Sequence, residues 1–264
     1  MIGILDSGVG GLGVLREVRV LLPDRDILYL ADQANAPYGE KTIDEVGAIT
    51  RRAVDWLLSQ GAVSITIACN TASAACLHEL RNERPGIPFI GMEPAVKPAS
   101  ALTQTGVIGV LATSVTFQGT LYASLVDRYG SEHQIVTRAC PEWVRLVEAG
   151  DLTSTDAESA VKACVQPLLD QGADVLVLGC THFPFLRPLI AKVVGPGVSI
   201  IDPAPSVAAR VVEMSPPRPG ETGRTVIATT ADPAKLSRLI SHLGGFEPSE
   251  IVLAWDLDDS PLPA

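Results

Sequence analysis

Short runs of apolar residues alternate along the chain with longer segments in which apolar residues recur at helical spacing. Nearly every position in the short runs is Val, Ile, Leu or another apolar residue, which is typical of parallel strands buried on both faces. Alternation of such strands with helices predicts an α/β fold with mostly parallel sheets. We expect strands at Ile2–Leu5, Ile27–Leu30, Ser64–Ala68, Ile87–Ile90, Val107–Leu111, Val175–Leu178, Val198–Ile201, Val226–Ala228 and Ile251–Ala254, and helices at Val14–Leu22, Val46–Gln60, Thr155–Gln171 and Ala234–Leu243.

Three segments depart from this pattern. Met92–Pro98 and Ser215–Gly223 are rich in proline, and we expect loops or boundaries there. The tail Asp256–Ala264 is acidic and contains two further prolines, so we expect a frayed end.

An internal repeat divides the chain. Leu57–Cys69 (LLSQGAVSITIAC) and Leu168–Cys180 (LLDQGADVLVLGC) are offset by 111 residues and share six of thirteen positions. A weaker similarity relates Ile2–Ser7 to Ile108–Thr113 at an offset of 106. In both long copies a helix ends at Gln-Gly-Ala, a strand follows, and a cysteine comes directly after the strand.

The repeat predicts two pseudo-symmetric lobes, each a mostly parallel sheet flanked by helices, with the active site between them. We expect residues 1–93 and 207–264 in the first lobe and 94–206 in the second, since the last two strands have no counterpart in the second half. Ligands of open parallel sheets bind outside the carboxyl ends of the strands. Cys69 and Cys180 therefore lie where a ligand is expected, on opposite sides of a shared cleft.

Composition and charge exclude several classes of protein. The chain has 264 residues, 47% of them hydrophobic, and a net charge of −10. Without a basic stripe or tail to neutralise phosphates, binding to nucleic acid or anionic membranes is not expected. There is no apolar run of membrane-spanning length and no basic flank typical of a signal peptide, so we expect a cytoplasmic protein.

Two opposed thiols suit the inversion of a stereocentre. Inversion by proton transfer needs a base on one face of the carbon and an acid on the other, and a thiolate and a thiol can exchange these roles. Asn70-Thr71 and Thr181-His182 follow the two cysteines and are predicted to begin helices, whose N-termini favour a thiolate and bind carboxylates. Cys76, Cys140 and Cys164 lack this context, and we expect them to be packed as small apolar residues.

A glycine-rich segment supports a rival interpretation. Gly8–Gly13 fits G-x-G-x-x-G between a strand and a helix, and Asp32 lies 19 residues beyond Gly13. This spacing is typical of a nicotinamide-dependent oxidoreductase. That reading leaves the cysteine repeat unexplained, and the same turn can bring backbone close to a small carboxylate. A solute-binding module with incidental cysteines and a one-cysteine decarboxylase or cis-trans isomerase are further alternatives.

The chain resembles bacterial glutamate racemases of the aspartate/glutamate racemase superfamily. The two cysteine motifs together are highly specific, whereas each short glycine or proline motif alone is weak. The matching segments follow the family's order over most of the chain: Asp6–Gly11, Pro37–Gly39, Ala68–Ser73, Glu93–Pro98, Val147–Gly150 and Gly179–His182.

The resemblance implies cofactor-independent interconversion of L- and D-glutamate, with no pyridoxal phosphate, metal or nucleotide, in a homodimer that supplies D-glutamate for peptidoglycan synthesis. Cys69 and Cys180 are the implied acid/bases, for D- and L-substrate respectively, assisted by Asp6 and His182. A carboxylate beside Cys69 would raise the pKa of that thiol, so Asp6 is expected to act as a proton relay. The expected substrate-binding residues are Asp6, Ser7, Pro37, Tyr38, Gly39, Asn70, Thr71, Thr181 and His182.

Three further residues are weaker candidates for contact with substrate. Thr113 is equivalent to Ser7 in the repeat, and Thr116 follows it closely. The alternative for Thr113 is a helix N-cap. Glu148 belongs to a matching segment, and its alternative is a solvated helix end.

Overall fold

The computed structural model describes residues 1–215, 220–243 and 248–253, and two parallel sheets form its framework. The first sheet has six strands in the order β10-β9-β2-β1-β3-β4, and the second has four in the order β6-β5-β7-β8. Their bounds are β1 Ile2–Asp6, β2 Ile27–Ala31, β3 Ser64–Ile67, β4 Phe89–Ile90, β9 Thr225–Thr229 and β10 Glu250–Leu253, and β5 Val107–Ala112, β6 Gln134–Ala139, β7 Val175–Gly179 and β8 Ser199–Ile201. The α/β class with two parallel sheets is confirmed.

The two sheets share one strand order. The series β2-β1-β3-β4 of the first sheet corresponds to β6-β5-β7-β8 of the second, and the first sheet adds β9 and β10 beside β2. The predicted repeat is thus a repeat of topology, in which β3 and β7 occupy equivalent places. The division of the chain at residues 93/94 and 206/207 stays a prediction.

The helices before β3 and β7 both end at the repeated Gln-Gly-Ala sequence, and they end with the same geometry. Gly61 and Gly172 have φ of +88° and +89°, a left-handed conformation that favours glycine. The following residues close the helix ends alike, because the Ala62 N–H donates to Leu57 O and the Ala173 N–H to Leu168 O, each at 3.1 Å. Each helix therefore turns into its strand with the same geometry, and each strand delivers its cysteine to an equivalent position.

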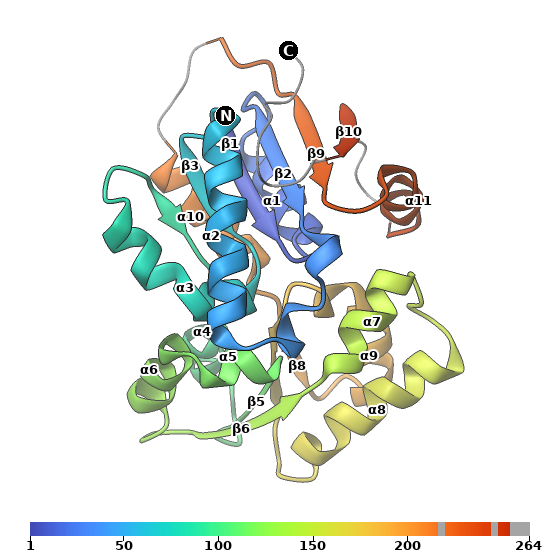
Figure 1. Cartoon of the computed structure of the whole chain (residues 1–264). Helices are drawn as coiled ribbons and strands as arrows, with labels where there is room; N and C mark the ends of the chain where they lie inside the picture. Colours follow the sequence, from blue (N-terminus) through green and yellow to red (C-terminus); the bar gives the residue numbers. More distant parts are fainter. Residues whose placement is uncertain (216–219, 244–247, 254–264) are drawn as a thin grey trace.

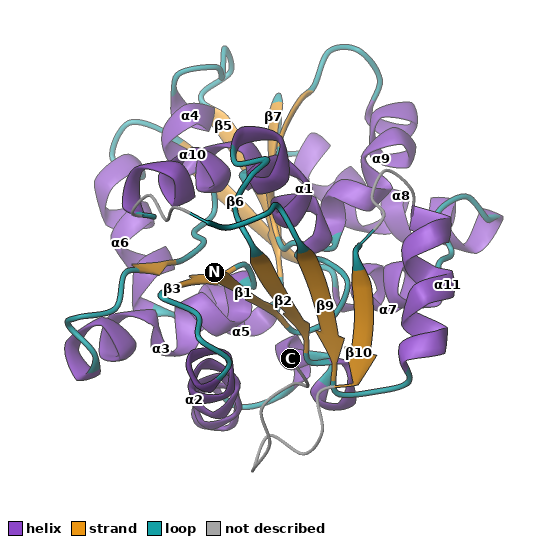
Figure 2. Cartoon of the chain, turned by 90° about the horizontal axis from the view of Figure 1, so that it is seen from above, coloured by secondary structure: helices purple, strands orange, loops and turns teal. Residues whose placement is uncertain are grey.

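Helices cover both faces of each sheet, as Figures 1 and 2 show. On β1, Ile4 packs in the core with α1 and α10, whereas Leu5 packs with α2 and α3. Such two-sided burial explains why the strands are almost entirely apolar. The helices are α1 Leu12–Leu21, α2 Ile43–Ser59, α3 Asn70–Glu83, α4 Val96–Ser100, α5 Ser114–Gln118, α6 Thr120–Tyr129, α7 Pro141–Ala149, α8 Thr155–Leu169, α9 Arg187–Val194, α10 Ala204–Met214 and α11 Pro233–Leu243, with 3₁₀ helices η1 Gln33–Asn35, η2 Tyr38–Glu40 and η3 Phe183–Leu186.

Some elements differ from those expected. Strand β6 was not predicted, because it lies at a sheet edge and only Val136 of its side chains is buried. The loop expected at Met92–Pro98 is wrong at its end, where α4 begins at Val96. Residues 216–219 of one predicted loop, Ala254 and the predicted frayed tail Asp256–Ala264 lie outside the described residues. No helix within the described ranges is long and apolar enough to cross a membrane.

Candidate active site

The predicted acid/base residues lie at the carboxyl ends of central strands in both sheets. Asp6 ends β1 and Cys69 follows β3 in the first sheet, whereas Thr113 and Cys180 follow the equivalent strands β5 and β7 in the second. Cys69 and Cys180 are only 4% and 6% exposed, and their sulfurs are close enough to interact electrostatically. The two sheets therefore bring both thiols into one enclosed site.

Cys180 contacts an imidazole that is itself held by a carboxylate. Its Sγ is 3.8 Å from His182 Nδ1, and His182 Nε2 is 2.7 Å from Glu148 Oε1. Burial opposes charge on the imidazole, but the contacts with Cys180 and Glu148 outweigh burial and raise the pKa of His182 well above its ordinary value. The ring is therefore an imidazolium at neutral pH, and it lies against Cys180 Sγ.

Glu148 on α7 connects this imidazole to the first sheet. Its Oε1 accepts a hydrogen bond from Val9 N (2.8 Å), and its Oε2 accepts one from Gln33 Nε2 (3.0 Å). Burial alone would raise the pKa of Glu148, but His182 and these donors outweigh it and lower the pKa. Both carboxylate oxygens are thus engaged by protein groups. Residue Gln33 was not predicted, because nothing local in the sequence marks a contact with a helix more than 100 residues away.

Cys69 has a different environment. Its Sγ donates to Ser7 Oγ at 3.8 Å. Burial and, next, the charge of Asp6 raise the pKa of the Cys69 thiol to about 12, although the Ala72 N–H at the start of α3 acts in the opposite direction. The N–H group at the helix N-terminus thus acts in the predicted direction, but burial and Asp6 outweigh it, and the effect of Asp6 has the expected sign. Cys69 is a thiol at neutral pH.

Asp6 lies between the two halves of the site. Its Oδ2 accepts a hydrogen bond from Gly8 N and its Oδ1 one from Thr181 Oγ1, both at 3.0 Å. Burial raises the pKa of Asp6, and the positive charge of His182 only partly offsets this effect. The Asp6 carboxyl group thus interacts with Cys69 and is hydrogen-bonded to Thr181, the residue after Cys180. Because its pKa is raised, it is suited to carry a proton.

Hydroxyl groups from both sheets meet beside Cys69. Thr71 Oγ1 lies 2.9 Å from Thr113 Oγ1, which lies 2.9 Å from Thr116 Oγ1. Thr113 is also the N-cap of α5 and accepts a hydrogen bond from Thr116 N, as its alternative reading proposed. Both polar atoms of the buried Asn70 amide lack a partner among the described residues, which is unfavourable unless a ligand binds them.

The loop after β2 contributes a third carboxylate, Asp32, which the sequence analysis did not assign to this site. Tyr38 Oη donates to Asp32 Oδ2 at 2.5 Å, and Asp32 also accepts hydrogen bonds from Asn35 and Thr230. The hydroxyl hydrogen of Tyr38 is therefore donated to Asp32. Asp32 directly follows β2, and this place at the carboxyl end of a strand could have identified it. Pro37 and Gly39 flank Tyr38, and Gly39 packs against Thr113.

The helix predicted after Cys180 begins differently from the one after Cys69. Asn70 is the first residue of α3, whereas Thr181 and His182 precede the short 3₁₀ helix η3, which leads into α9. The other cysteines lie outside the site. Cys76 is buried within α3, and Cys140 precedes α7 and packs near Cys164 of α8.

The glycine-rich turn after β1 is filled by side chains from the second half of the chain. A Cβ on Gly8 would lie 1.9 Å from Glu148 Oε1, and one on Gly10 would lie 2.5 Å from both His182 Nδ1 and Thr181 Oγ1. These glycines are needed because Glu148 and His182 approach the backbone closely. The contacts account for the motif that otherwise suggested a dinucleotide site.

We expect Gly8→Ala to lower the pKa of His182, because the new methyl group displaces the Glu148 carboxylate that raises it. The displaced atoms are the end of a flexible side chain, so we expect the melting temperature to change by only a few degrees. NMR titration of the four histidines measures the pKa directly. Gly13→Ala is the matched control, since its Cβ meets no atom within 4 Å; an unchanged His182 pKa in Gly8→Ala would contradict the assignment.

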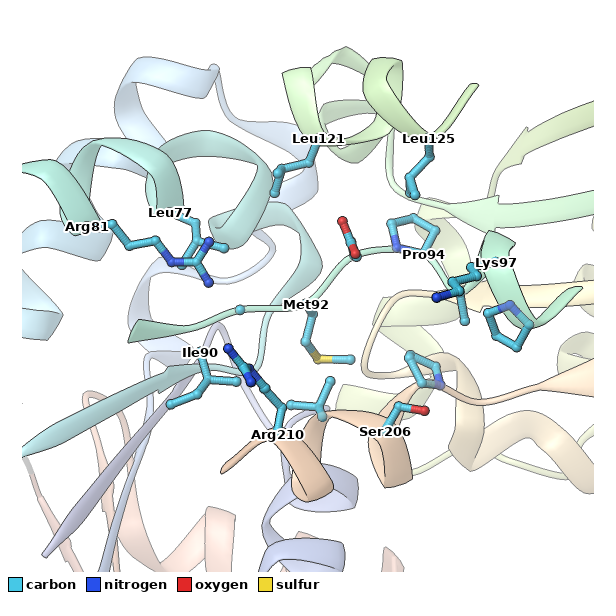
Figure 3. A pocket seen from close by; sticks show the side chains of 16 residues that line it. Leu77, Arg81, Ile90, Met92, Pro94, Lys97, Leu121, Leu125, Ser206 and Arg210 are labelled. Carbon is cyan, nitrogen blue, oxygen red and sulfur yellow. The ribbon is translucent and has the colours of Figure 1, made fainter. Parts of the chain in front are cut away.

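A separate cavity of about 470 Å³ lies between α3, α6 and α10, and Figure 3 shows its lining. The segment Gly91–Pro98 forms one wall, and Arg81 and Arg210 are among the other lining residues. None of the predicted acid/base or substrate-binding residues lines it. The site described above is therefore distinct from this cavity. Among the residues with described positions, no group of three or more His, Cys, Asp or Glu side chains is arranged to hold a metal ion.

Comparison with known proteins gives a consistent result. The sequence profile of the Asp/Glu/hydantoin racemase family matches residues 13–211. A protein named glutamate racemase from Pseudomonas entomophila (strain L48) is 46% identical over 246 residues, which cover 92% of this chain and 93% of that protein.

Solved structures show the same relationship. The crystal structure of a glutamate racemase isoform from Bacillus anthracis superposes with a TM-score of 0.86 and 30% identity, covering 100% of this chain and 98% of that one. The glutamate racemase of Francisella tularensis subsp. tularensis SCHU S4, solved in complex with D-glutamate, has a TM-score of 0.84 and 26% identity, with 97% of each chain covered.

Proposed function

The chain belongs to the Asp/Glu/hydantoin racemase family, and from this premise we propose that it interconverts L- and D-glutamate by proton transfer at the α-carbon between Cys69 and Cys180. The relatives named glutamate racemase, and the neighbour solved with D-glutamate, support glutamate as the substrate. The proposed chemistry uses side chains alone, without a cofactor.

One observation carries the mechanism: two enclosed thiols in equivalent places have different neighbours. Cys69 is a thiol, because burial and Asp6 raise its pKa to about 12. Cys180 Sγ, in contrast, lies 3.8 Å from His182 Nδ1. We propose that Cys69 acts first as the acid and Cys180 as the base, because inversion in a single passage requires one of each.

In the L-to-D direction, Cys180 thiolate removes the α-proton of L-glutamate, and the electron pair of the C–H bond moves toward the α-carboxylate. The Cys69 thiol then delivers its proton to the opposite face, which forms D-glutamate. The products of this step are a Cys69 thiolate and a Cys180 thiol. In the D-to-L direction the same events run in reverse, starting from that second protonation state.

After each L-to-D turnover, the Cys69 thiolate must regain a proton and the Cys180 thiol must lose one before the next L-glutamate reacts. Asp6 is placed for this transfer, because it interacts with Cys69 and bonds to Thr181, the residue after Cys180. Its raised pKa allows it to take up a proton and release it again. We propose that Asp6 relays the proton on the Cys69 side and that His182 does so on the Cys180 side.

Polar groups around the thiols would hold the substrate. The unpaired amide of Asn70 and the hydroxyl chain from Thr71 are the strongest candidates, since the amide gains hydrogen bonds only from a ligand. Fixed donors in an enclosed site also stabilise the charge that develops on the α-carboxylate. The proposed substrate-binding residues remain Asp6, Ser7, Pro37, Tyr38, Gly39, Asn70, Thr71, Thr113, Thr116, Thr181 and His182, whereas we reassign Glu148 as a positioning residue for His182.

Glu148→Gln should shift the alkaline limb of the kcat/KM profile to lower pH by about one unit. Glu148 raises the pKa of His182, so its neutral replacement lets the imidazolium lose its proton at lower pH. Profiles from pH 6 to 10 measure the shift in either direction of reaction. Glu158→Gln, on the exposed surface of α8, is the control and should leave the limb in place. An unshifted limb in Glu148→Gln would contradict this assignment.

The proposed activity is tested by incubating the purified protein with L-glutamate, D-glutamate or L-aspartate and separating the enantiomers chromatographically. We expect each glutamate enantiomer to approach an equal mixture and aspartate to remain unchanged. Optically stable glutamate under these conditions would overturn the proposal. Family membership also supports a role in supplying D-glutamate for peptidoglycan synthesis. A homodimer and a cytoplasmic location remain predictions.

A further inference from the structure

A groove runs between α7 and α11, and we call it the α7–α11 groove. It consists of two neighbouring cavities, of about 240 and 550 Å³, which share Glu148 and Lys235 in their walls. Helices α7 and α11 lie on the same side of the molecule in Figures 1 and 2, and His242 Nε2 contacts Gly150 O at 2.8 Å across the groove. The side chains that line the groove include Gln33, Pro37, Arg145, Asp232, Arg238 and His242.

One wall of the groove contacts a proposed catalytic residue. Glu148 in its wall contacts His182, which contacts Cys180. Pro37 in the opposite wall precedes Tyr38 and Gly39 of the substrate-binding loop. Elements of both sheets form the walls, so separation of the two halves would open the groove toward the enclosed thiols.

The charges in the groove differ from those of the whole protein. Lys235 and Arg238 are exposed, lie one turn apart on α11 and form no ion pair within the described part of the chain. Arg145, in contrast, pairs with Glu40 and Glu142. The local acids are engaged too, because Glu148 binds His182 and Asp232 accepts hydrogen bonds from N–H groups at the start of α11.

We propose that the α7–α11 groove is the route by which substrate reaches Cys69 and Cys180, and that Lys235 and Arg238 bind a carboxylate of the anionic amino acid at its mouth. The inference rests on the proposed function, because it takes glutamate as the ligand. A protein of net charge −10 repels an anion at long range. Two unpaired cations beside the catalytic residues reverse that repulsion locally.

The test reverses the two charges and compares the effect with an equal change elsewhere. Lys235→Glu with Arg238→Glu changes the net charge by −4, and Arg52→Glu with Arg128→Glu makes the same change on exposed positions of α2 and α6. In Figure 2 these helices lie on the other side of the molecule from α11. None of the four residues belongs to the proposed catalytic or substrate-binding set.

We expect the groove variant to raise KM for both glutamate enantiomers about threefold to tenfold relative to the α2/α6 variant at low ionic strength, with kcat within twofold. The difference should shrink as NaCl rises from about 20 to 300 mM, because salt screens exposed charges. Equal KM values in the two variants would overturn the groove proposal and leave the proposed function standing.

A wild-type protein that does not racemise glutamate would overturn the proposed function. In that case calorimetric titration with D-glutamate still decides the role of the groove. Weaker binding by the groove variant than by the α2/α6 variant would support it, and equal or absent binding would overturn it.

Discussion

Cys69→Ala and Cys180→Ala should each reduce glutamate racemisation by at least about 1,000-fold. Each thiol is the only proposed proton donor or acceptor on its face of the α-carbon, so loss of either one interrupts transfer in both directions. Acid/base groups of this kind contribute rate factors of about 100 to 10,000. Initial rates from L- and from D-glutamate, measured by circular dichroism, give the loss in each direction.

Matched cysteine variants control for packing. Cys76 is buried within α3 and Cys164 is partly exposed on α8, so Cys76→Ala and Cys164→Ala remove thiols outside the site. Both should retain activity within severalfold of the wild type. The α-carbon chemistry would have to be reassigned if Cys69→Ala or Cys180→Ala remained as active as these controls. Ligand binding without turnover in both active-site variants would still agree with the account, whereas a solute-binding module predicts no turnover in the wild type either.

His182→Asn should lower kcat in the L-to-D direction about 10-fold to 100-fold, with a smaller loss from D to L. In the proposed mechanism, His182 contacts Cys180 and stabilises the thiolate that takes the proton from L-glutamate. Asp6→Asn should show the opposite preference, because Asp6 interacts with Cys69. The magnitudes follow from the usual contribution of a proton-transfer partner.

The unequal effects of His182→Asn and Asp6→Asn on the two directions can be seen in kcat and in KM, but not in their ratio. The two enantiomers are equally stable in water, so kcat/KM is the same in both directions for every variant. A variant that slows one direction more than the other at saturation therefore changes the ratio of the two KM values by the same factor. Full progress curves from each enantiomer yield both constants. Equal kcat losses in the two directions, for both Asp6→Asn and His182→Asn, would show that the helpers are not specific to one thiol.

Most of the strands and both site cysteines could be predicted from the sequence, because the patterns that mark them are local or repeated. Apolar runs locate most strands, since two-sided burial leaves little room for polar residues. The repeated Gln-Gly-Ala before each strand indicates a helix that ends at a glycine. Gly61 and Gly172 have the left-handed conformation that such helix ends favour. Cys69 and Cys180 follow from the same repeat.

Other features depend on contacts between distant segments. The approach of Glu148 to Gly8 joins positions 140 residues apart, and a glycine motif alone does not reveal which side chain fills the turn. The pKa of the Cys69 thiol depends on such contacts as well. The sequence indicates the helix that begins after Cys69, but burial and the charge of Asp6 depend on the packing of whole sheets and prevail over it.

The central claim is that two opposed thiols exchange a proton with opposite faces of one carbon. Its most direct test is proton NMR of L-glutamate incubated with the enzyme in deuterated water. We predict that D-glutamate formed in the first turnovers carries deuterium at its α-carbon, while unreacted L-glutamate keeps its α-proton, and that Cys69→Ala forms no D-glutamate. D-glutamate that retains the original α-proton, or inversion that persists in Cys69→Ala, would contradict the two-thiol mechanism.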